Sequence, residues 1–161
     1  MTPPGSLPPG TVGRYEGDNE AGDRAAIHAL LVAYGETLDR RDFDAFALLF
    51  GDDGVFMIGD KAASGQEAAD FMRETYRTGK NVARTPNFHL FFNEVVTFDG
   101  PDRALATSMC VYMVTDDVFP VPGPSGRYAD ELAKKNGRWY IARRRIIRID
   151  NAPSRLEQAA G

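Results

Sequence analysis

The chain has 161 residues, of which 43% are hydrophobic and one is a cysteine. This length allows one domain with a sizeable core and is short for two. The 19 basic and 23 acidic residues give a net charge of −4, which does not favour binding to a nucleic-acid backbone. No apolar stretch approaches the about 20 residues of a membrane span, and no signal-peptide pattern opens the chain. We therefore expect a soluble, cytoplasmic protein without a nucleic-acid or membrane partner.

The N-terminal residues 1–21 are rich in proline and glycine, a composition typical of a flexible arm. We expect the folded domain to cover residues 22–150 and a tail to cover residues 151–161. From Asp23 the apolar residues recur at helical spacing, and a second short helix is predicted after the capping residue Asp42. The apolar stripe of the first helix consists of Ile27, Leu30, Leu31, Tyr34 and Leu38.

The remaining elements are predicted from capping and turn signals. A short strand is predicted over residues 55–59, and Ser64 with Glu67 has the spacing of a capping box at the start of the next helix. The later runs are rich in β-branched and aromatic residues, and the proline-rich segment 120–126 is expected to be a loop. Helices followed by a curved antiparallel sheet indicate an α+β fold. The predicted strands cover residues 87–98, 104–118, 127–134 and 139–149.

The sequence contains no Gly-rich phosphate loop, no G-x-S-x-G motif and no zinc-binding motif, so we expect neither a cofactor nor a metal. Its two histidines differ in setting. His28 lies beside the apolar stripe of the first helix, where we expect it to face solvent. His89 lies in a predicted strand, where Phe91, Asn93 and Val95 share its face. That mixture of side chains suits a half-apolar pocket.

Asp39 ends the first predicted helix, where the helix dipole disfavours a carboxylate. We therefore expect a group from elsewhere in the fold to hold it. The spacing of residues does not identify that group, because the contact is not local.

Three segments resemble the SnoaL-like branch of the nuclear transport factor 2-like superfamily: DRAAIHALLVAYGETLDRRDFDAFALLF, TPNFHLFFNEVVTFDG and GRYADELAKKNGRWYIARRRI. The resemblance covers residues 22–150 and implies a cone-shaped barrel of three N-terminal helices packed in a curved, mixed, mainly antiparallel sheet. The positions of Tyr34, Asp39 and His89 are similar to those in scytalone dehydratase and bile-acid 7α-dehydratase. Those enzymes remove a proton next to a leaving group with a paired aspartate and histidine.

The resemblance implies a role for each of these residues. Asp39 would orient the imidazole of His89 and stabilise its charge, His89 would be the general base, and Tyr34 would donate a hydrogen bond to a substrate oxygen. An imidazole with an ordinary pKa of about 6.5 is available as a free base at neutral pH. The second catalytic histidine of scytalone dehydratase has no evident counterpart, and Tyr112 stands nearest to the position where bile-acid 7α-dehydratase has an aspartate. The residues expected to bind substrate are Phe91, Asn93, Tyr112 and Tyr128.

Several of these residues also have a structural interpretation. His89 and Tyr34 are compatible with a packed core, and Asp39 is compatible with a cap on the second helix. The run Arg143–Arg145 alternates faces in a strand, so we expect it on an exposed edge or at an oligomer contact. The outer face of the last strand is expected to support a homodimer or homotrimer. The last predicted strand carries Ile146, Ile147 and Ile149 among arginines.

Two classes of function remain open. The first is a cofactor-independent lyase or isomerase, such as a dehydratase or cyclase, acting on a hydrophobic, oxygenated small molecule. The second is a non-catalytic module for binding or oligomerisation, like the small subunit of ring-hydroxylating dioxygenases, because a fold does not dictate its function. A cavity of about 300 Å³ or more beside His89 favours the enzyme, and a filled cone favours the module.

Overall fold

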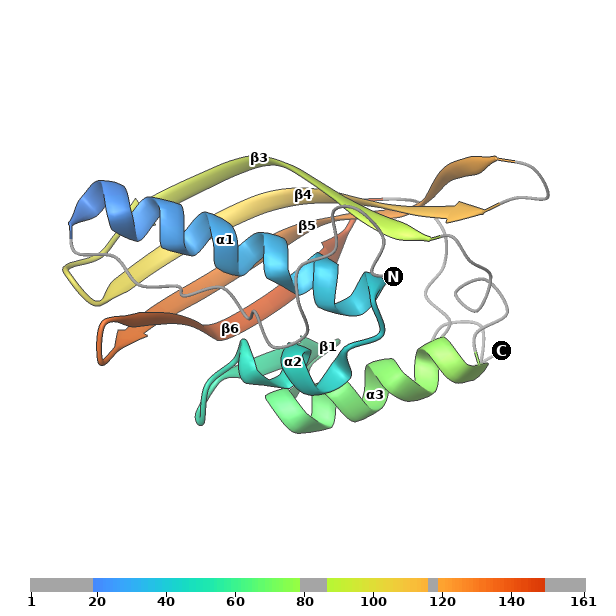
Figure 1. The fold of residues 1–161 in the computed structure, drawn as a ribbon, viewed down its shortest axis with the longest axis horizontal. Coiled ribbons are helices and arrows are strands. Elements are labelled where there is room, and N and C mark those ends of the chain that lie inside the picture. Colours follow the sequence, from blue (N-terminus) through green and yellow to red (C-terminus); the bar gives the residue numbers. More distant parts are fainter. Residues whose placement is uncertain (1–18, 79–86, 116–118, 150–161) are drawn as a thin grey trace, which may run out of the picture.

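The computed structural model of the protein describes residues 19–78, 87–115 and 119–149 (Figure 1). The expected arm and tail lie outside the described residues, apart from the arm's last three residues, Asn19 to Ala21. The described residues form α1 (Glu20–Asp39), α2 (Phe43–Leu48), β1 (Val55–Ile58), β2 (Lys61–Ser64), α3 (Gly65–Thr78), β3 (Phe88–Phe98), β4 (Arg103–Thr115), β5 (Pro120–Lys135) and β6 (Arg138–Arg148). No helix among these combines the length and the apolar composition required to cross a membrane.

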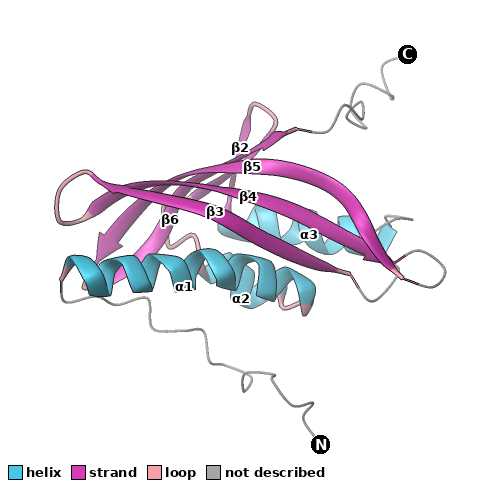
Figure 2. Cartoon of the chain, turned by 90° about the horizontal axis from the view of Figure 1, so that it is seen from above, coloured by secondary structure: helices cyan, strands magenta, loops and turns pink. Residues whose placement is uncertain are grey.

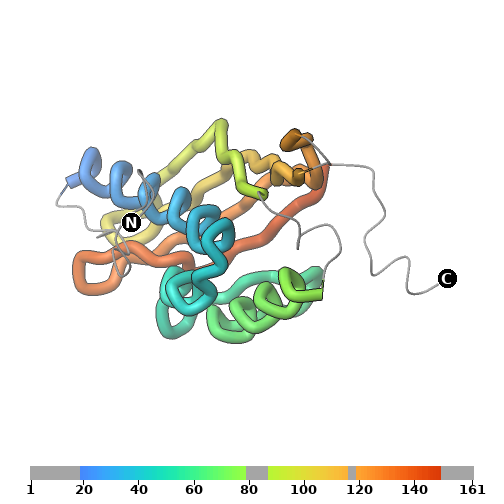
Figure 3. The backbone as a smooth tube through the Cα atoms, turned by 45° about the vertical axis from the view of Figure 1, so that its right-hand side comes forward, coloured from blue at the N-terminus to red at the C-terminus, as the bar shows by residue number. Residues whose placement is uncertain are grey.

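The strands form one sheet in the order β2-β1-β6-β5-β4-β3. Neighbouring strands are antiparallel, except that β1 and β6 are parallel. Figure 2 shows the sheet curving over α1, and Figure 3 shows α2 and α3 together below α1. The predicted α+β fold, with three helices packed in a curved, mixed and mainly antiparallel sheet, is confirmed.

Helix α1 begins three residues before the predicted Asp23. Its N-cap is Asn19, whose side chain accepts a hydrogen bond from the backbone N–H of Gly22 at 3.0 Å. Asp23 lies buried in the first turn and accepts hydrogen bonds from the Trp139 indole at 2.7 Å and from Lys134 Nζ at 2.8 Å. These contacts attach the start of the helix to the β5–β6 hairpin.

The predicted apolar stripe of α1 faces the sheet. Ile27, Leu30 and Tyr34 are at most 1% exposed and pack with Phe46 of α2 and Trp139 of β6. Removing each such side chain from water contributes about 1.5–3 kcal/mol to folding. This core fixes the position of α1 and therefore the position of its last residue.

The predicted capping box at the start of α3 is present. The backbone N–H of Ser64 donates to Glu67 Oε2 at 2.8 Å, and the backbone N–H of Glu67 donates to Ser64 Oγ at 3.3 Å. Strand β2, just before it, was not predicted. It pairs with β1 through a tight turn in which Gly59 has a φ of +62°, a conformation that glycine adopts without strain.

The expected loop at residues 120–126 is instead the first part of β5. It pairs with β4, where Val121 lies opposite Val114 and Ser125 lies opposite Val111. Prolines are tolerated here because this end of β5 is an edge: the register with β6 stops at Gly126.

The expectation for Arg143–Arg145 is wrong for the middle residue. β6 lies between β1 and β5 and is an interior strand of the sheet. Arg143 and Arg145 are exposed, whereas Arg144 is 0% exposed and points to the inner face. Alternation along a strand places one residue of any three on the opposite side from its neighbours.

Candidate active site

Asp39 and His89 meet where the end of α1 crosses the start of β3. Asp39 Oδ1 lies 2.6 Å from Nδ1 of the imidazole, and the carboxylate also accepts the backbone N–H of His89 at 3.0 and 3.2 Å. The side chain of His89 is 9% exposed and that of Asp39 is 21% exposed. Because an ionised carboxylate only accepts hydrogen bonds, the tautomer of a neutral imidazole that fits this contact has its proton on Nδ1 and its lone pair on Nε2. His89 is therefore the group that holds Asp39 at the end of its helix.

Arg41 offsets the unfavourable interaction between the Asp39 carboxylate and the dipole at the C-terminal end of α1. Its guanidinium donates to the backbone carbonyls of Leu38 at 2.8 Å and Asp39 at 3.2 Å, and to Asn87 Oδ1 at 2.5 Å. A cation on the last carbonyls of a helix interacts favourably with the dipole. Arg41 itself has a φ of +61°, so the chain turns sharply after Asp39 and leaves the carboxylate facing β3.

Gly35 allows α1 and β3 to approach closely enough for this contact. A Cβ atom at Gly35 would lie 2.6 Å from Cε2 of Phe91 and 3.2 Å from Cβ of His89. Gly35 and Asp39 are four residues apart, on one face of the helix. The helix thus presents a flat surface to Phe91 one turn before the carboxylate that binds His89.

Asn93 does not share the face of His89, contrary to the sequence prediction. The register between β3 and β4 shifts between Phe92 and Val95, and Asn93 has a φ of +54°. Such a β-bulge inserts an extra residue and exchanges the two faces of the strand. Asn93 is exposed and Val95 is 60% exposed, while Val96 takes the inner face.

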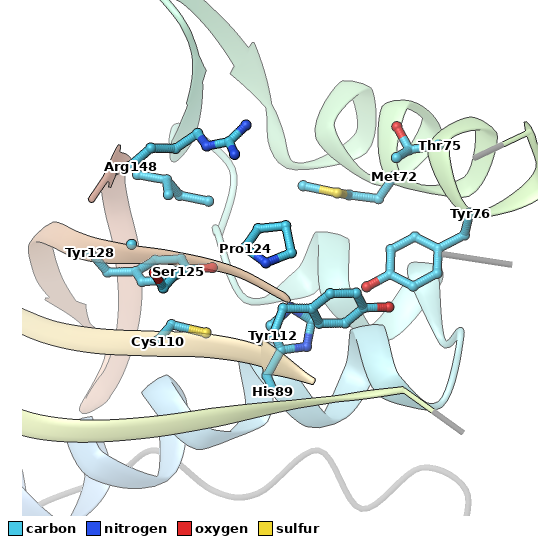
Figure 4. A pocket seen from close by; sticks show the side chains of 12 residues that line it. Met72, Thr75, Tyr76, His89, Cys110, Tyr112, Pro124, Ser125, Tyr128 and Arg148 are labelled. Carbon is cyan, nitrogen blue, oxygen red and sulfur yellow. The ribbon is translucent and has the colours of Figure 1, made fainter. Parts of the chain in front are cut away.

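A cavity of about 240 Å³ lies beside His89, between α3 and the inner face of the sheet (Figure 4). It is smaller than the volume of about 300 Å³ expected of an enzyme, but it is open to one side and is not filled by the phenylalanines of β3. Its volume suits a ligand smaller than a typical drug molecule. Most of the lining is apolar, and its reactive side chains are Tyr76, His89, Cys110, Tyr112 and Tyr128.

Two tyrosines of the sheet, both expected to bind substrate, line the cavity. Tyr112 lies directly opposite His89 in the β3–β4 register, and its ring centre is 4.7 Å from that of the imidazole. Tyr128 lines the cavity from β5. His89 lines the cavity, whereas Asp39 is not part of the lining.

Tyr34 and Phe91 lie one layer behind the cavity, which differs from the roles expected for them. Tyr34 is 1% exposed, and its hydroxyl shares a hydrogen bond with the hydroxyl of Tyr128. Phe91 packs against both rings, with centroids 6.2 Å from Tyr34 and 5.3 Å from Tyr128. Neither side chain is part of the cavity wall.

Burial controls the ionisation of the cavity wall. It raises the pKa of Tyr76, Tyr112 and Tyr128 above the ordinary value for a phenol, and for Tyr112 the nearby Tyr76 hydroxyl and Arg41 guanidinium oppose this effect. Burial also raises the pKa of the Cys110 thiol to about 11. At neutral pH these groups are uncharged hydrogen-bond donors.

A model of the SnoaL-like domain matches residues 19–145. The chain belongs to the SnoaL-like family. No curated protein matches it.

Solved structures share the fold of this SnoaL-like protein. A singly substituted form of Rv3472, a protein of unknown function from Mycobacterium tuberculosis, is 28% identical, with a TM-score of 0.66 and coverage of 80% of this chain and 72% of the other. An NTF2-like protein with a cystatin-like fold from Novosphingobium aromaticivorans is 23% identical, with a TM-score of 0.71 and coverage of 83% and 86%. A proposed scytalone dehydratase from the same organism is 22% identical, with a TM-score of 0.65 and coverage of 80% and 85%.

A buried ion pair that was not predicted lies beneath the tyrosines of this SnoaL-like domain. Arg144 donates to Asp130 through Nε at 2.7 Å and Nη2 at 2.8 Å, and both side chains are fully buried. The guanidinium lies 4.0 Å from the ring centre of Tyr34 and 4.7 Å from that of Tyr128. Burial disfavours the charge on Arg144, yet the adjacent Asp130 carboxylate holds its pKa above the ordinary value. Counting from the hairpin turn would place Asp130 opposite Arg143, and it is the register shift between Glu131 and Leu132 that places it opposite Arg144, so no local signal in the sequence identified the pair.

His28 is not part of the site. Its side chain is 66% exposed, as expected, and its Nδ1 lies 2.9 Å from Glu94 Oε2 on the bulge of β3. A pair this exposed contributes little to stability.

Proposed function

We propose that this protein is a cofactor-independent enzyme of the lyase or isomerase kind, which removes a proton from a hydrophobic, oxygenated small molecule with His89. The observation that carries the proposal is the hydrogen bond of 2.6 Å between Asp39 Oδ1 and His89 Nδ1, on an imidazole that lines a cavity. The family and the fold of the proposed scytalone dehydratase are consistent with this chemistry, but the proposal depends on the residues of this chain.

The proposed step begins with the lone pair on Nε2 of His89. It takes a proton from a carbon next to a carbonyl group, and the electrons of the C–H bond move into the enolate. The imidazolium that forms is stabilised by the Asp39 carboxylate. Three outcomes follow from one enolate: loss of a hydroxyl or halide is an elimination, return of the proton at another carbon is an isomerisation, and attack on a second carbonyl is a cyclisation.

The proposal is tested by proton exchange, which all three outcomes share. The protein is incubated in D₂O with 1-tetralone, a bicyclic ketone with exchangeable protons next to its carbonyl, and deuterium uptake is followed by NMR. We expect faster uptake than in buffer, and a decrease of about 10²- to 10⁴-fold in the His89→Ala variant. His28→Ala is the matched control, because it removes the only other histidine and leaves the site intact.

Uptake at the buffer rate in the wild type, together with binding of the ketone, would support the second function instead. In that case the protein is a non-catalytic module that binds small molecules. The open cavity would then be a binding site, and His89 would be a structural partner of Asp39.

We also propose that the protein associates as a homodimer or homotrimer through the outer face of the sheet. Phe92, Leu105 and Ile147 on β3, β4 and β6 are 44%, 55% and 47% exposed. The strand register aligns Phe92, Met109, Arg127 and Ile147 across that face. Exposed apolar patches of this kind mark interaction sites. Sedimentation velocity checks the proposal, and a monomer at working concentration contradicts it.

A further inference from the structure

The hydroxyl of Tyr112 is a buried donor without a matched acceptor. Tyr112 is 7% exposed, and no described residue lies in hydrogen-bonding geometry to accept its hydroxyl proton, although two donors, the Tyr76 hydroxyl and the Arg41 guanidinium, lie near its oxygen. Figure 4 shows this hydroxyl pointing across the cavity toward the hydroxyl of Tyr76 on α3. Buried polar groups in native proteins nearly always have a partner, so an exception at a cavity wall indicates a ligand or water that supplies one.

Two residues near the end of α1, Arg41 and Phe43, hold the ring of Tyr76 in place. The guanidinium of Arg41 lies 4.1 Å from the centre of its ring, and Phe43 packs edge-on at 5.8 Å. Arg41 is the residue that also binds the backbone carbonyl of Asp39. The Tyr76 hydroxyl therefore has a fixed position relative to the end of α1.

The chemistry of this pair suits an oxygen that accepts hydrogen bonds. Because the pKa values of Tyr76 and Tyr112 are raised, both groups keep their protons and donate hydrogen bonds at neutral pH. Two hydroxyls hold two protons, and a hydrogen bond between them uses one, so at least one proton remains for a ligand. A carbonyl oxygen accepts such a bond, and the oxyanion of an enolate accepts it more strongly.

We propose that Tyr112 and Tyr76 form the oxygen-binding site of the cavity, in place of Tyr34. The ligand is a ketone of one or two rings with a removable proton next to its carbonyl. This follows from the position of His89: its ring centre lies 4.7 Å from that of Tyr112, with the two rings tilted by 46°, so an oxygen on the tyrosine pair leaves the adjacent carbon beside the imidazole. The requirement that the ligand carries a removable proton rests on the proposed function, whereas the oxygen-binding site does not depend on it.

The test compares two ligands that differ only in the oxygen. Dissociation constants of 1-tetralone and of tetralin, the same skeleton without the carbonyl group, are measured by ligand-observed NMR. We expect the wild type to prefer the ketone, and Tyr112→Phe and Tyr76→Phe each to weaken ketone binding about three- to tenfold without changing tetralin binding. Tyr140→Phe, on a tyrosine outside this cavity, is the control that keeps the preference.

Thermal unfolding separates ligand binding from a structural role. If the Tyr112 hydroxyl serves a ligand, Tyr112→Phe leaves the Tm of the unliganded protein unchanged or raises it, because an unmatched buried donor is removed. A lowered Tm, equal affinity of the wild type for both compounds, or binding of neither overturns the inference. Ketone preference without deuterium uptake supports the oxygen site and rejects the proposed function, so the two failures are distinguishable.

Discussion

The carboxylate of Asp39 accepts hydrogen bonds from both the backbone N–H and the ring Nδ1 of His89, at 3.0 and 2.6 Å. The two residues are 50 positions apart in the chain, so one side chain joins α1 to β3 and orients the imidazole as well. The contact therefore contributes both to the stability of the fold and to the charge stabilisation of the imidazole, and suitable substitutions separate these two contributions.

Asp39→Asn is expected to separate these parts. An asparagine keeps an oxygen that accepts the backbone N–H, but it loses the charge that stabilises the imidazolium. We expect the rate of deuterium uptake by 1-tetralone to fall about 10²- to 10⁴-fold, while the free energy of unfolding in urea falls by about 1 kcal/mol. A variant with the wild-type exchange rate would show that Asp39 is only structural.

The Asp130 and Arg144 pair predicts strong coupling between two substitutions. Arg144→Met leaves a buried carboxylate without its cation, and we expect a loss of about 3–5 kcal/mol in the free energy of unfolding. Asp130→Leu is expected to cost a similar amount, because it leaves the buried guanidinium without its carboxylate. The double variant, with no buried charge, is expected within about 1–2 kcal/mol of the wild type. Urea denaturation followed by circular dichroism measures all three, and additive losses would argue against the pair.

Gly35→Ala is expected to destabilise the protein although alanine is the better helix former. The added methyl group gains about 1 kcal/mol in helix propensity but meets the ring of Phe91 at 2.6 Å. Overpacking of this kind costs about 1–3 kcal/mol. We expect a net loss in urea denaturation together with slower proton exchange, because His89 moves with Phe91. Ala33→Gly, on a partly buried position of the same helix, should lose stability without affecting exchange.

The rate at which Cys110 is alkylated is expected to depend strongly on pH. With a pKa of about 11, the thiol is protonated below pH 10, and its thiolate fraction at pH 8 is about a hundredfold smaller than that of a thiol with a pKa of 9. Alkylation by iodoacetamide is therefore expected to be slow at pH 8 and to rise tenfold per pH unit up to about pH 11. Mass spectrometry gives an unambiguous readout, since the chain has one cysteine. Fast labelling at pH 8 would contradict burial of the thiol.

Local signals were sufficient for much of the fold. The apolar stripe of α1 and the capping box of Ser64 and Glu67 depend on residues within one or two helical turns of each other. The hairpin turn between β5 and β6 is equally local: Asn136 and Gly137 have φ of +52° and +79°, as their sequence indicates. Each of these features is stabilised mainly by its own neighbours in the chain.

The features that were missed depend on partners far away in the chain. The bulge at Asn93 is a matter of register with β4, and the burial of Arg144 follows from the place of β6 in the sheet. The pairing of residues 120–126 depends on β4 offering an edge. Alternation within a strand predicts two faces but does not say which face is buried, nor where an extra residue exchanges them.

The candidate site also contains features that were predicted and features that were not. The Asp39 and His89 pair was predicted through a family resemblance, because spacing alone could not bring two such distant residues together. Tyr112 and Tyr128, two of the residues expected to bind substrate, line the cavity, whereas Tyr34 lies behind it. The depth of a tyrosine depends on how closely the helix packs on the sheet, and that distance is set by Gly35.

Helix α3 contacts α2, β1 and β2, while the proposed base lies on β3 and its carboxylate partner on α1. The part of the wall formed by Met72 and Thr75 is therefore built on a different part of the scaffold from the groups proposed to move the proton, whereas Tyr76 is linked to them through Arg41. Substitutions at Met72 and Thr75 are expected to reshape the cavity without disturbing the hydrogen bonds of His89. An ancestral protein with this layout could exchange one substrate for another by changing a single helix, and a protein engineer could follow the same route.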